Sequence, residues 1–215
     1  MDTNTPSTPK IPMVAKLLFT AFMVVLVPFY WQNYGPTNFL YFCDVALFLT
    51  LIGMWTEKSF PISMATVGIM IPQILWIVDY GSNLAGVPLI GLTDYMFDPN
   101  NPLFNRSLSL FHGWLPLLLI WLTARVGYDR RAALAWIGTA WVLLVVCYLW
   151  MPAPPADPND PNLPVNINYV YGFDGQQQWV SDIAWLGIVL LLQPLAVVGP
   201  THWLLQRFAP KACNR

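Results

Sequence analysis

The chain has 215 residues, of which 56% are hydrophobic and only 10% are charged. A soluble domain carries about 25% charged residues, so this composition excludes an ordinary soluble protein and is typical of a multi-pass membrane protein. The net charge of −1 gives no argument for nucleic-acid binding. The cysteines, Cys43, Cys147 and Cys213, predict no disulfide framework, because none falls in a predicted extracytoplasmic loop.

The apolar runs predict an all-α membrane protein. Residues 1–11 form a polar tail, and the apolar run after it is expected to be a permanent span, because it is too long for a cleaved signal. A bilayer core of about 30 Å needs about 20 apolar residues per helix. Lipid requires each span to be helical, because unpaired backbone groups are costly there. A six-helix bundle over residues 12–208 is predicted, before a tail at 209–215, with spans at 12–31, 38–55, 60–78, 107–126, 132–151 and 183–208.

The basic residues predict the orientation of these spans. Nine of the ten lysines and arginines fall on one side of the six-span arrangement, and only Arg106 falls on the other. Because basic residues collect in cytoplasmic flanks, both termini are predicted to be cytoplasmic, in the cell membrane. The connections at 79–106 and 152–182 are then long extracytoplasmic loops. The aromatic, amide-rich second half of the later loop predicts an ordered lid rather than a linker.

Ionisable groups collect near the outer ends of the predicted spans. Cys43 and Asp44 lie five to six residues into the second span, and His112 lies five residues into the fourth. At 1.5 Å per residue these groups share a depth of about 7–8 Å, and Asp79 ends the third span on the same side. A carboxylate within a span costs about 2.5–3.5 kcal/mol, so Asp44 marks a candidate functional site.

A thiol beside an imidazole is a minimal nucleophile–base pair, so Cys43 and His112 are the candidate catalytic residues. Asp44 and Asp79 are candidates to orient the imidazole or to bind substrate. Three loop residues are candidates to donate hydrogen bonds to an acyl oxyanion: Asn166, Asn168 and Tyr169. No metal site and no cofactor are predicted.

Structural interpretations of the same residues stay open. A cysteine in a span is often a small packing residue, and a histidine there is often satisfied by a backbone carbonyl. Asp44 and Asp79 can also act as interhelical hydrogen-bonding groups. Cys147 is a rival thiol without a polar neighbour in sequence. His202 is expected to be structural, because it lies near the inner end of its span, about 15 Å or more in depth from His112.

Three short segments carry a resemblance to a known family. The segment from Leu40 to Leu49, which contains Cys43 and Asp44, looks like the Leu-Cys-Asp segment of the YwaF-like integral membrane proteins, the bacterial relatives of transmembrane protein 164. His112-Gly113 resembles their His-Gly, and Asn168-Tyr169 resembles their Asn-Tyr before the last span. The layout is also similar to the androgen-induced-protein family of intramembrane hydrolases. The chain departs from the pattern at Tyr41, where the resemblance predicts a histidine.

The resemblance implies a six-helix enzyme that acts on lipid acyl esters, with Cys43 as nucleophile and His112 as base. The leading hypothesis is therefore an intramembrane lipid acyltransferase or acyl-ester hydrolase at the outer leaflet, with a membrane lipid as substrate. The competing hypothesis is a non-enzymatic membrane protein: a small-solute or proton-coupled carrier, or an assembly partner. In a carrier, Asp44, Asp79 and His112 would form a proton or cation path.

Overall fold

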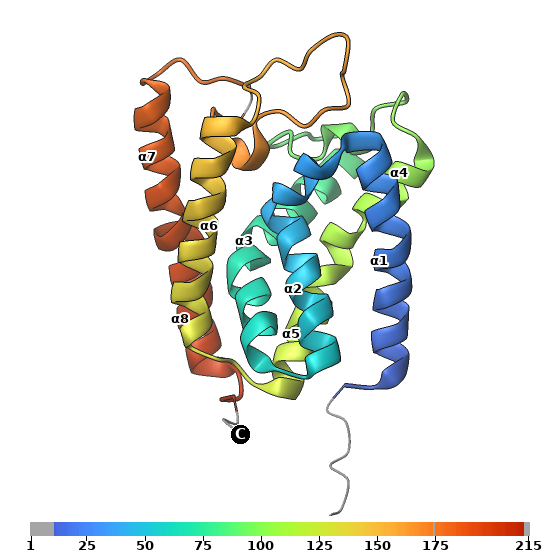
Figure 1. Ribbon diagram of the computed structural model, residues 1–215, viewed down its shortest axis with the longest axis vertical. Helices are drawn as coiled ribbons and strands as arrows, with labels where there is room; N and C mark the ends of the chain where they lie inside the picture. The colour runs from blue at the N-terminus through green and yellow to red at the C-terminus, as the bar shows by residue number, and fades with distance from the viewer. Residues whose placement is uncertain (1–10, 174, 213–215) are drawn as a thin grey trace, which may run out of the picture.

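The computed structural model describes residues 11–173 and 175–212. It is a bundle of long helices that run between two ends (Figure 1). Among these residues there is no strand, and one isolated bridge pairs Tyr128 with Lys211. Most of the predicted tail at 1–11, together with Cys213 and Arg215, lies outside the described part of the chain. The helices are α1 (Met13–Tyr34), α2 (Phe42–Thr56), α3 (Ser59–Leu84), α4 (Leu103–Ser109), α5 (Phe111–Val126), α6 (Arg131–Trp150), α7 (Asp182–Leu192) and α8 (Gly199–Phe208).

Five helical segments of the described chain are long and apolar enough to cross a membrane. They are α1, α3, α4 with α5, α6, and α7 with α8. The second predicted span is present as a shorter helix, α2, which has 15 residues. It begins at Phe42 rather than at 38, because a 3₁₀ turn over Pro36–Leu40 and an extended Tyr41 precede it.

Other predicted spans also differ from the structure: the first helix ends at Tyr34 instead of 31, and the fourth segment begins at Leu103 instead of 107. The third span continues to Leu84 instead of ending at 78. The last span is interrupted by a π-helical segment, Gln193–Val198, between α7 and α8. Prolines inside α1, α3 and α5 do not end those helices, since each helix continues past Pro28, Pro72 or Pro116.

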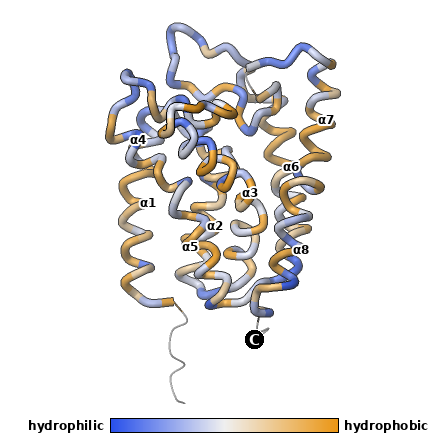
Figure 2. The backbone as a smooth tube through the Cα atoms, turned by 180° about the vertical axis from the view of Figure 1, so that it is seen from behind, coloured by the Kyte–Doolittle hydropathy of each residue, from blue (hydrophilic) through white to orange (hydrophobic). Residues whose placement is uncertain are grey.

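The outward faces of the bundle are apolar, as lipid contact requires. Large apolar side chains point outward from several helices, among them Leu18, Leu117, Leu134 and Leu195, the third of which is 78% exposed. Apolar residues cover the middle of the bundle, and polar residues gather at its two ends (Figure 2). An exposed apolar surface of this extent is unstable in water, so the chain has the character of a membrane-embedded protein.

The centre of the bundle is α3, which packs against α2, α5 and α6. Its residue Gly68 faces the indole ring of Trp136 on α6, which is fully buried. A Cβ atom at Gly68 would overlap that ring, so the absence of a side chain is what lets α3 and α6 approach. The centre of the bundle is therefore closely packed, and the polar residues lie at its two ends (Figure 2).

The two ends of the bundle differ in charge. We call the end that holds the connections 35–41, 85–102 and 151–181 the loop end, and the opposite end the basic end. The helix α1 begins and α8 ends at the basic end (Figure 1). Arg106 is the one described lysine or arginine at the loop end, and the others lie at the basic end: Lys16, Lys58, Arg125, Arg130, Arg131, Arg207 and Lys211.

Candidate functional site at the loop end

Asp44 lies in the first turn of α2 and is almost fully buried, with 2% of its surface exposed. Its Oδ2 atom accepts a hydrogen bond of 3.0 Å from the side-chain amide of Asn38. The other carboxylate oxygen, Oδ1, is buried and makes no hydrogen bond with the described residues. A buried polar atom without a partner carries the full cost of its desolvation, so Asp44 is an incompletely satisfied buried carboxyl group.

Asn168 holds the start of α2 in place. Its Oδ1 atom accepts a hydrogen bond from the backbone N–H of Phe42, at 3.0 Å, and its Nδ2 atom donates to the carbonyl of Leu40, at 2.9 Å. Asn168 adopts a left-handed backbone conformation, with φ of 58°, which asparagine tolerates better than most residues. The later loop is thereby fastened directly to the helix that carries Cys43, and this contact supports the predicted ordered lid.

The two loop asparagines use their side-chain amides mainly within the chain. The Nδ2 atom of Asn166 donates to the Gly172 carbonyl, and its Oδ1 atom accepts from the Tyr171 N–H. The Asn168 amide donates both of its N–H groups within the chain, to the Leu40 carbonyl and the Cys147 sulfur, whereas the Asn166 amide donates only one of its two. Asn168 therefore has no free donor for an oxyanion. The Tyr169 hydroxyl makes no hydrogen bond with the described residues, while the Tyr169 carbonyl accepts one from the indole of Trp185.

Asp79 organises the earlier loop rather than the imidazole. Its carboxylate accepts hydrogen bonds of 2.7–3.2 Å from the backbone N–H groups of Ile90, Gly91 and Thr93, and one of 2.8 Å from the Thr93 hydroxyl. Asp79 is fully buried. The expectation that it orients His112 is therefore corrected: four donors of its own loop already saturate the carboxylate.

The His112 ring is held by a carbonyl and by aromatic rings. Its Nδ1 atom lies 2.8 Å from the carbonyl oxygen of Ser109, and the ring stacks on Trp76 with a centroid separation of 5.1 Å. The Trp76 indole N–H in turn donates to the Tyr95 hydroxyl at 3.2 Å. The orienting partner of the imidazole is thus a backbone carbonyl, whereas the sequence predicted a carboxylate. No hydrogen bond joins His112 to Cys43 among the described residues.

Two tyrosines connect the surroundings of Cys43 to those of His112. Burial raises the pKa of Tyr95, and the nearby Cys43 thiol and Tyr169 raise it further, against the opposing effect of the hydrogen bond from Trp76. Burial also raises the pKa of Tyr169, with smaller contributions from Cys43 and Asp79. Tyr95 is therefore within electrostatic range of the thiol, and it accepts a hydrogen bond from Trp76, on which His112 stacks.

Sequence reasoning missed the aromatic part of this site. Trp76 stacks on His112 and donates to Tyr95, and the Tyr30 hydroxyl lies 3.3 Å from the Ser109 hydroxyl. With aromatic residues at 15% of the chain, nothing in the sequence separates Tyr30, Trp76 and Tyr95 from interfacial aromatics. We call the set of Tyr30, Asp44, Trp76, Tyr95, Ser109 and His112, together with Cys43, the loop-end centre.

The second described cysteine also lies at the loop end, whereas the second histidine lies at the opposite end of the bundle. Cys147 is fully buried, and its sulfur lies 3.7 Å from the Asn168 amide nitrogen. Neither Cys43 nor Cys147 forms a disulfide. His202 belongs to the basic end, where its Nδ1 atom lies 2.6 Å from the Tyr128 hydroxyl. Within residues 11–173 and 175–212, no three His, Cys, Asp or Glu side chains are grouped as a metal site requires.

No protein-family model, curated protein or solved structure matches this chain. The resemblance to the YwaF-like proteins stays a prediction.

Proposed function

We propose that the chain is a six-span protein of the cell membrane with its basic end in the cytoplasm, and that the loop-end centre acts on the acyl esters of membrane lipids. The segregation of basic residues supports this orientation. The short helix α2 measures about 22 Å, and the 3₁₀ turn before it adds residues on the loop side. In this proposal α2 also crosses the membrane, which brings the five longer segments to a total of six spans. In this orientation the centre faces the outer leaflet.

The observation that carries the enzymatic proposal is the hydrogen bond of His112. A backbone carbonyl only accepts hydrogen bonds, so the Nδ1 atom near Ser109 carries the proton of the neutral ring. The Nε2 atom then presents its lone pair, which is the form that a general base requires. Cys43 is half-buried and within electrostatic range of Tyr95, which accepts the hydrogen bond from Trp76.

In the proposed reaction the lipid ester occupies the space between the thiol and the imidazole. His112 Nε2 takes the thiol proton, and the Cys43 sulfur attacks the ester carbonyl carbon. The C–O bond to the lipid alcohol breaks, and the alcohol oxygen receives the proton from His112. Water or a second lipid hydroxyl then attacks the thioester, with its proton passing to His112. The C–S bond breaks, and the thiolate recovers that proton. The free Tyr169 hydroxyl is the proposed donor to the oxyanion.

Trapping of the acyl-enzyme tests this proposal. The full chain in proteoliposomes is incubated with a phospholipid that carries a pyrene-labelled acyl chain, and intact mass spectrometry measures a hydroxylamine-sensitive acyl adduct. We expect an adduct on the wild type, none on Cys43→Ala, and adduct formation slowed about 100-fold or more in His112→Gln. Cys147→Ala is the matched thiol control and should retain the adduct. Equal labelling of the wild type, Cys43→Ala and His112→Gln would refute the proposal.

The buried, unpartnered oxygen of Asp44 favours a second candidate, a proton- or cation-coupled carrier. In such a carrier the transported proton or cation binds to the Oδ1 atom of Asp44, because Asn38 contacts only the Oδ2 atom. Solute flux in proteoliposomes under a pH gradient separates the two functions. A carrier loses its flux in Asp44→Asn and keeps it in Cys43→Ser, whereas the enzyme shows no gradient-dependent flux and loses acyl transfer in Cys43→Ser.

A further inference from the structure

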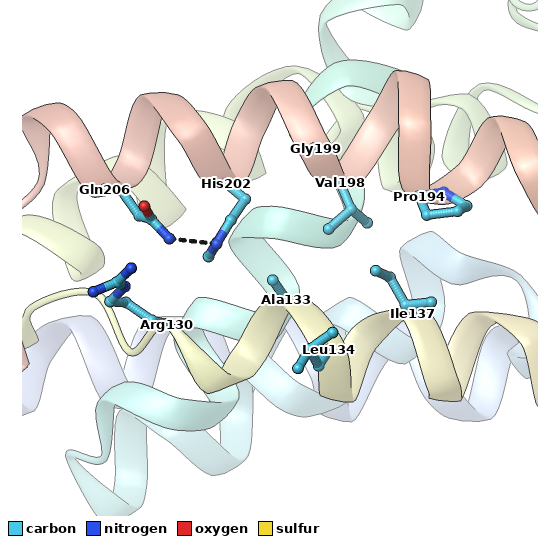
Figure 3. Close-up of a pocket in the computed structure, with 9 residues that line it drawn as sticks. All are labelled: Arg130, Ala133, Leu134, Ile137, Pro194, Val198, Gly199, His202 and Gln206. Carbon is cyan, nitrogen blue, oxygen red and sulfur yellow. Dashed lines mark hydrogen bonds between the residues drawn. The ribbon is translucent and has the colours of Figure 1, made fainter.

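A groove of about 370 Å³ opens between α6 and the last helix at the basic end (Figure 3). Its walls are mostly apolar and come from both helices: Ala133, Leu134 and Ile137 on one side, and Pro194 and Val198 on the other. Leu134 lines the groove while 78% of its surface is exposed on the outside of the bundle. The groove is therefore an apolar recess on a face that contacts lipid in a membrane-embedded chain.

The irregular last helix forms one wall of this recess. The π-helical segment Gln193–Val198 separates α7 from α8, and Pro194 stands near its start. A π-helical turn widens the helix and removes its regular packing ridge, and such turns are frequent at functional sites. Gly199 follows, and a Cβ atom there would lie 3.0 Å from the Pro194 carbonyl oxygen. The recess is thus built by the backbone rather than left by one missing side chain.

Polar side chains gather at one end of the groove. Arg130, His202 and Gln206 line it, and Figure 3 shows all three at the same end of the recess. Arg130 makes no hydrogen bond or ion pair with the described residues. In contrast, its neighbour Arg131 is paired with Asp129 at 2.7 Å. A second recess of about 180 Å³ shares Arg130 and Gln206 with the groove and is also lined by Lys211.

We propose that this groove binds an anionic phospholipid, with the phosphate between Arg130 and Lys211 and one acyl chain along the apolar walls. An unpaired guanidinium offers a phosphate several fixed N–H donors, and basic pockets between spans bind acidic lipid head groups. The apolar length of the recess distinguishes a lipid from a free anion, which needs no such walls. The site is separate from the loop-end centre and depends only on membrane embedding.

Native mass spectrometry of the delipidated full chain in detergent micelles tests this site with phosphatidylglycerol and phosphatidylcholine of identical chains. We expect the wild type to prefer phosphatidylglycerol, and Arg130→Gln to weaken its binding about fivefold. Arg125→Gln is the matched control, because it removes the same charge near the same end and should change nothing. Leu134→Trp narrows the groove from an exposed position and should weaken binding of both lipids.

Three results would overturn the proposal. One is equal phosphatidylglycerol binding by Arg130→Gln and Arg125→Gln. Another is equal affinity of the wild type for the two lipids. The third is displacement of phosphatidylglycerol by millimolar inorganic phosphate, which would make the site one for free anions. Acyl-adduct formation at Cys43 is a separate readout, so failure here does not depend on failure of the enzymatic proposal.

Discussion

The substitution Gly68→Ala tests the packing at the centre of the bundle. An ideal Cβ atom at residue 68 would lie inside the contact distance of the Trp136 ring atoms Cε2, Cδ2 and Cζ2. The ring cannot swing into open space, because Trp136 is fully buried. To restore a carbon–carbon contact of about 3.5–4.0 Å, α3 and α6 must separate by about 1 Å or more at their crossing.

Overpacking of a well-packed core typically costs about 1–3 kcal/mol, and this contact involves ring atoms that cannot yield, so we expect about 2–3 kcal/mol for Gly68→Ala. For a chain of this size that loss lowers the unfolding midpoint by about 4–12 °C. Tryptophan fluorescence during heating in detergent measures the midpoint. The matched control is Gly138→Ala on α6, where a Cβ atom meets no atom within 4 Å and alanine should be neutral or mildly stabilising.

A double-mutant cycle identifies the cause. If the ring is responsible, Trp136→Phe should relieve much of the cost of Gly68→Ala, because the smaller side chain leaves room for the new methyl group. The coupling between the two substitutions should then be about 1 kcal/mol or more in the stabilising direction. The reasoning is refuted if Gly68→Ala and Gly138→Ala have the same midpoint, or if the two effects at residues 68 and 136 simply add.

Three further predictions concern the connections between helices. Asn168→Ala should cost about 2 kcal/mol and speed amide exchange at the start of α2, because it removes two hydrogen bonds; unchanged exchange would argue against the clamp. Gly127→Ala should release the C-terminal segment to proteolysis, since φ is 84° and a Cβ atom would lie 2.6 Å from the Lys211 carbonyl oxygen; an unchanged cleavage pattern would contradict this. Hydrogen bonds from Arg131 hold the pKa of Asp129 below its usual range, so its stabilisation is present above about pH 4 and is lost as pH falls through the lowered pKa. The unfolding midpoint of Asp129→Asn should therefore vary less with pH below about 4 than that of the wild type, and identical pH profiles would refute the assignment.

The sequence by itself determined the helical segments and the segregation of charge. The reason is local: each apolar run must satisfy its own backbone hydrogen bonds in lipid, so composition alone predicts helices. The same argument located the long polar connections between the helices. It was less accurate for the start of α2, because a 3₁₀ turn and an extended Tyr41 have the same apolar composition as a helix end.

Only the tertiary structure decided how the polar residues are used. Phe42 and Asn168 are 126 residues apart in sequence, and their hydrogen bond exists because the later loop folds back over α2. The sequence made Asp79 a candidate partner for His112, but four donors of its own loop bind the Asp79 carboxylate. The His112 ring nitrogen is hydrogen-bonded instead to the carbonyl of Ser109, three residues earlier in the chain. A side chain bonds to whichever group lies within about 3 Å, and that distance is set by how helices pack rather than by residue type.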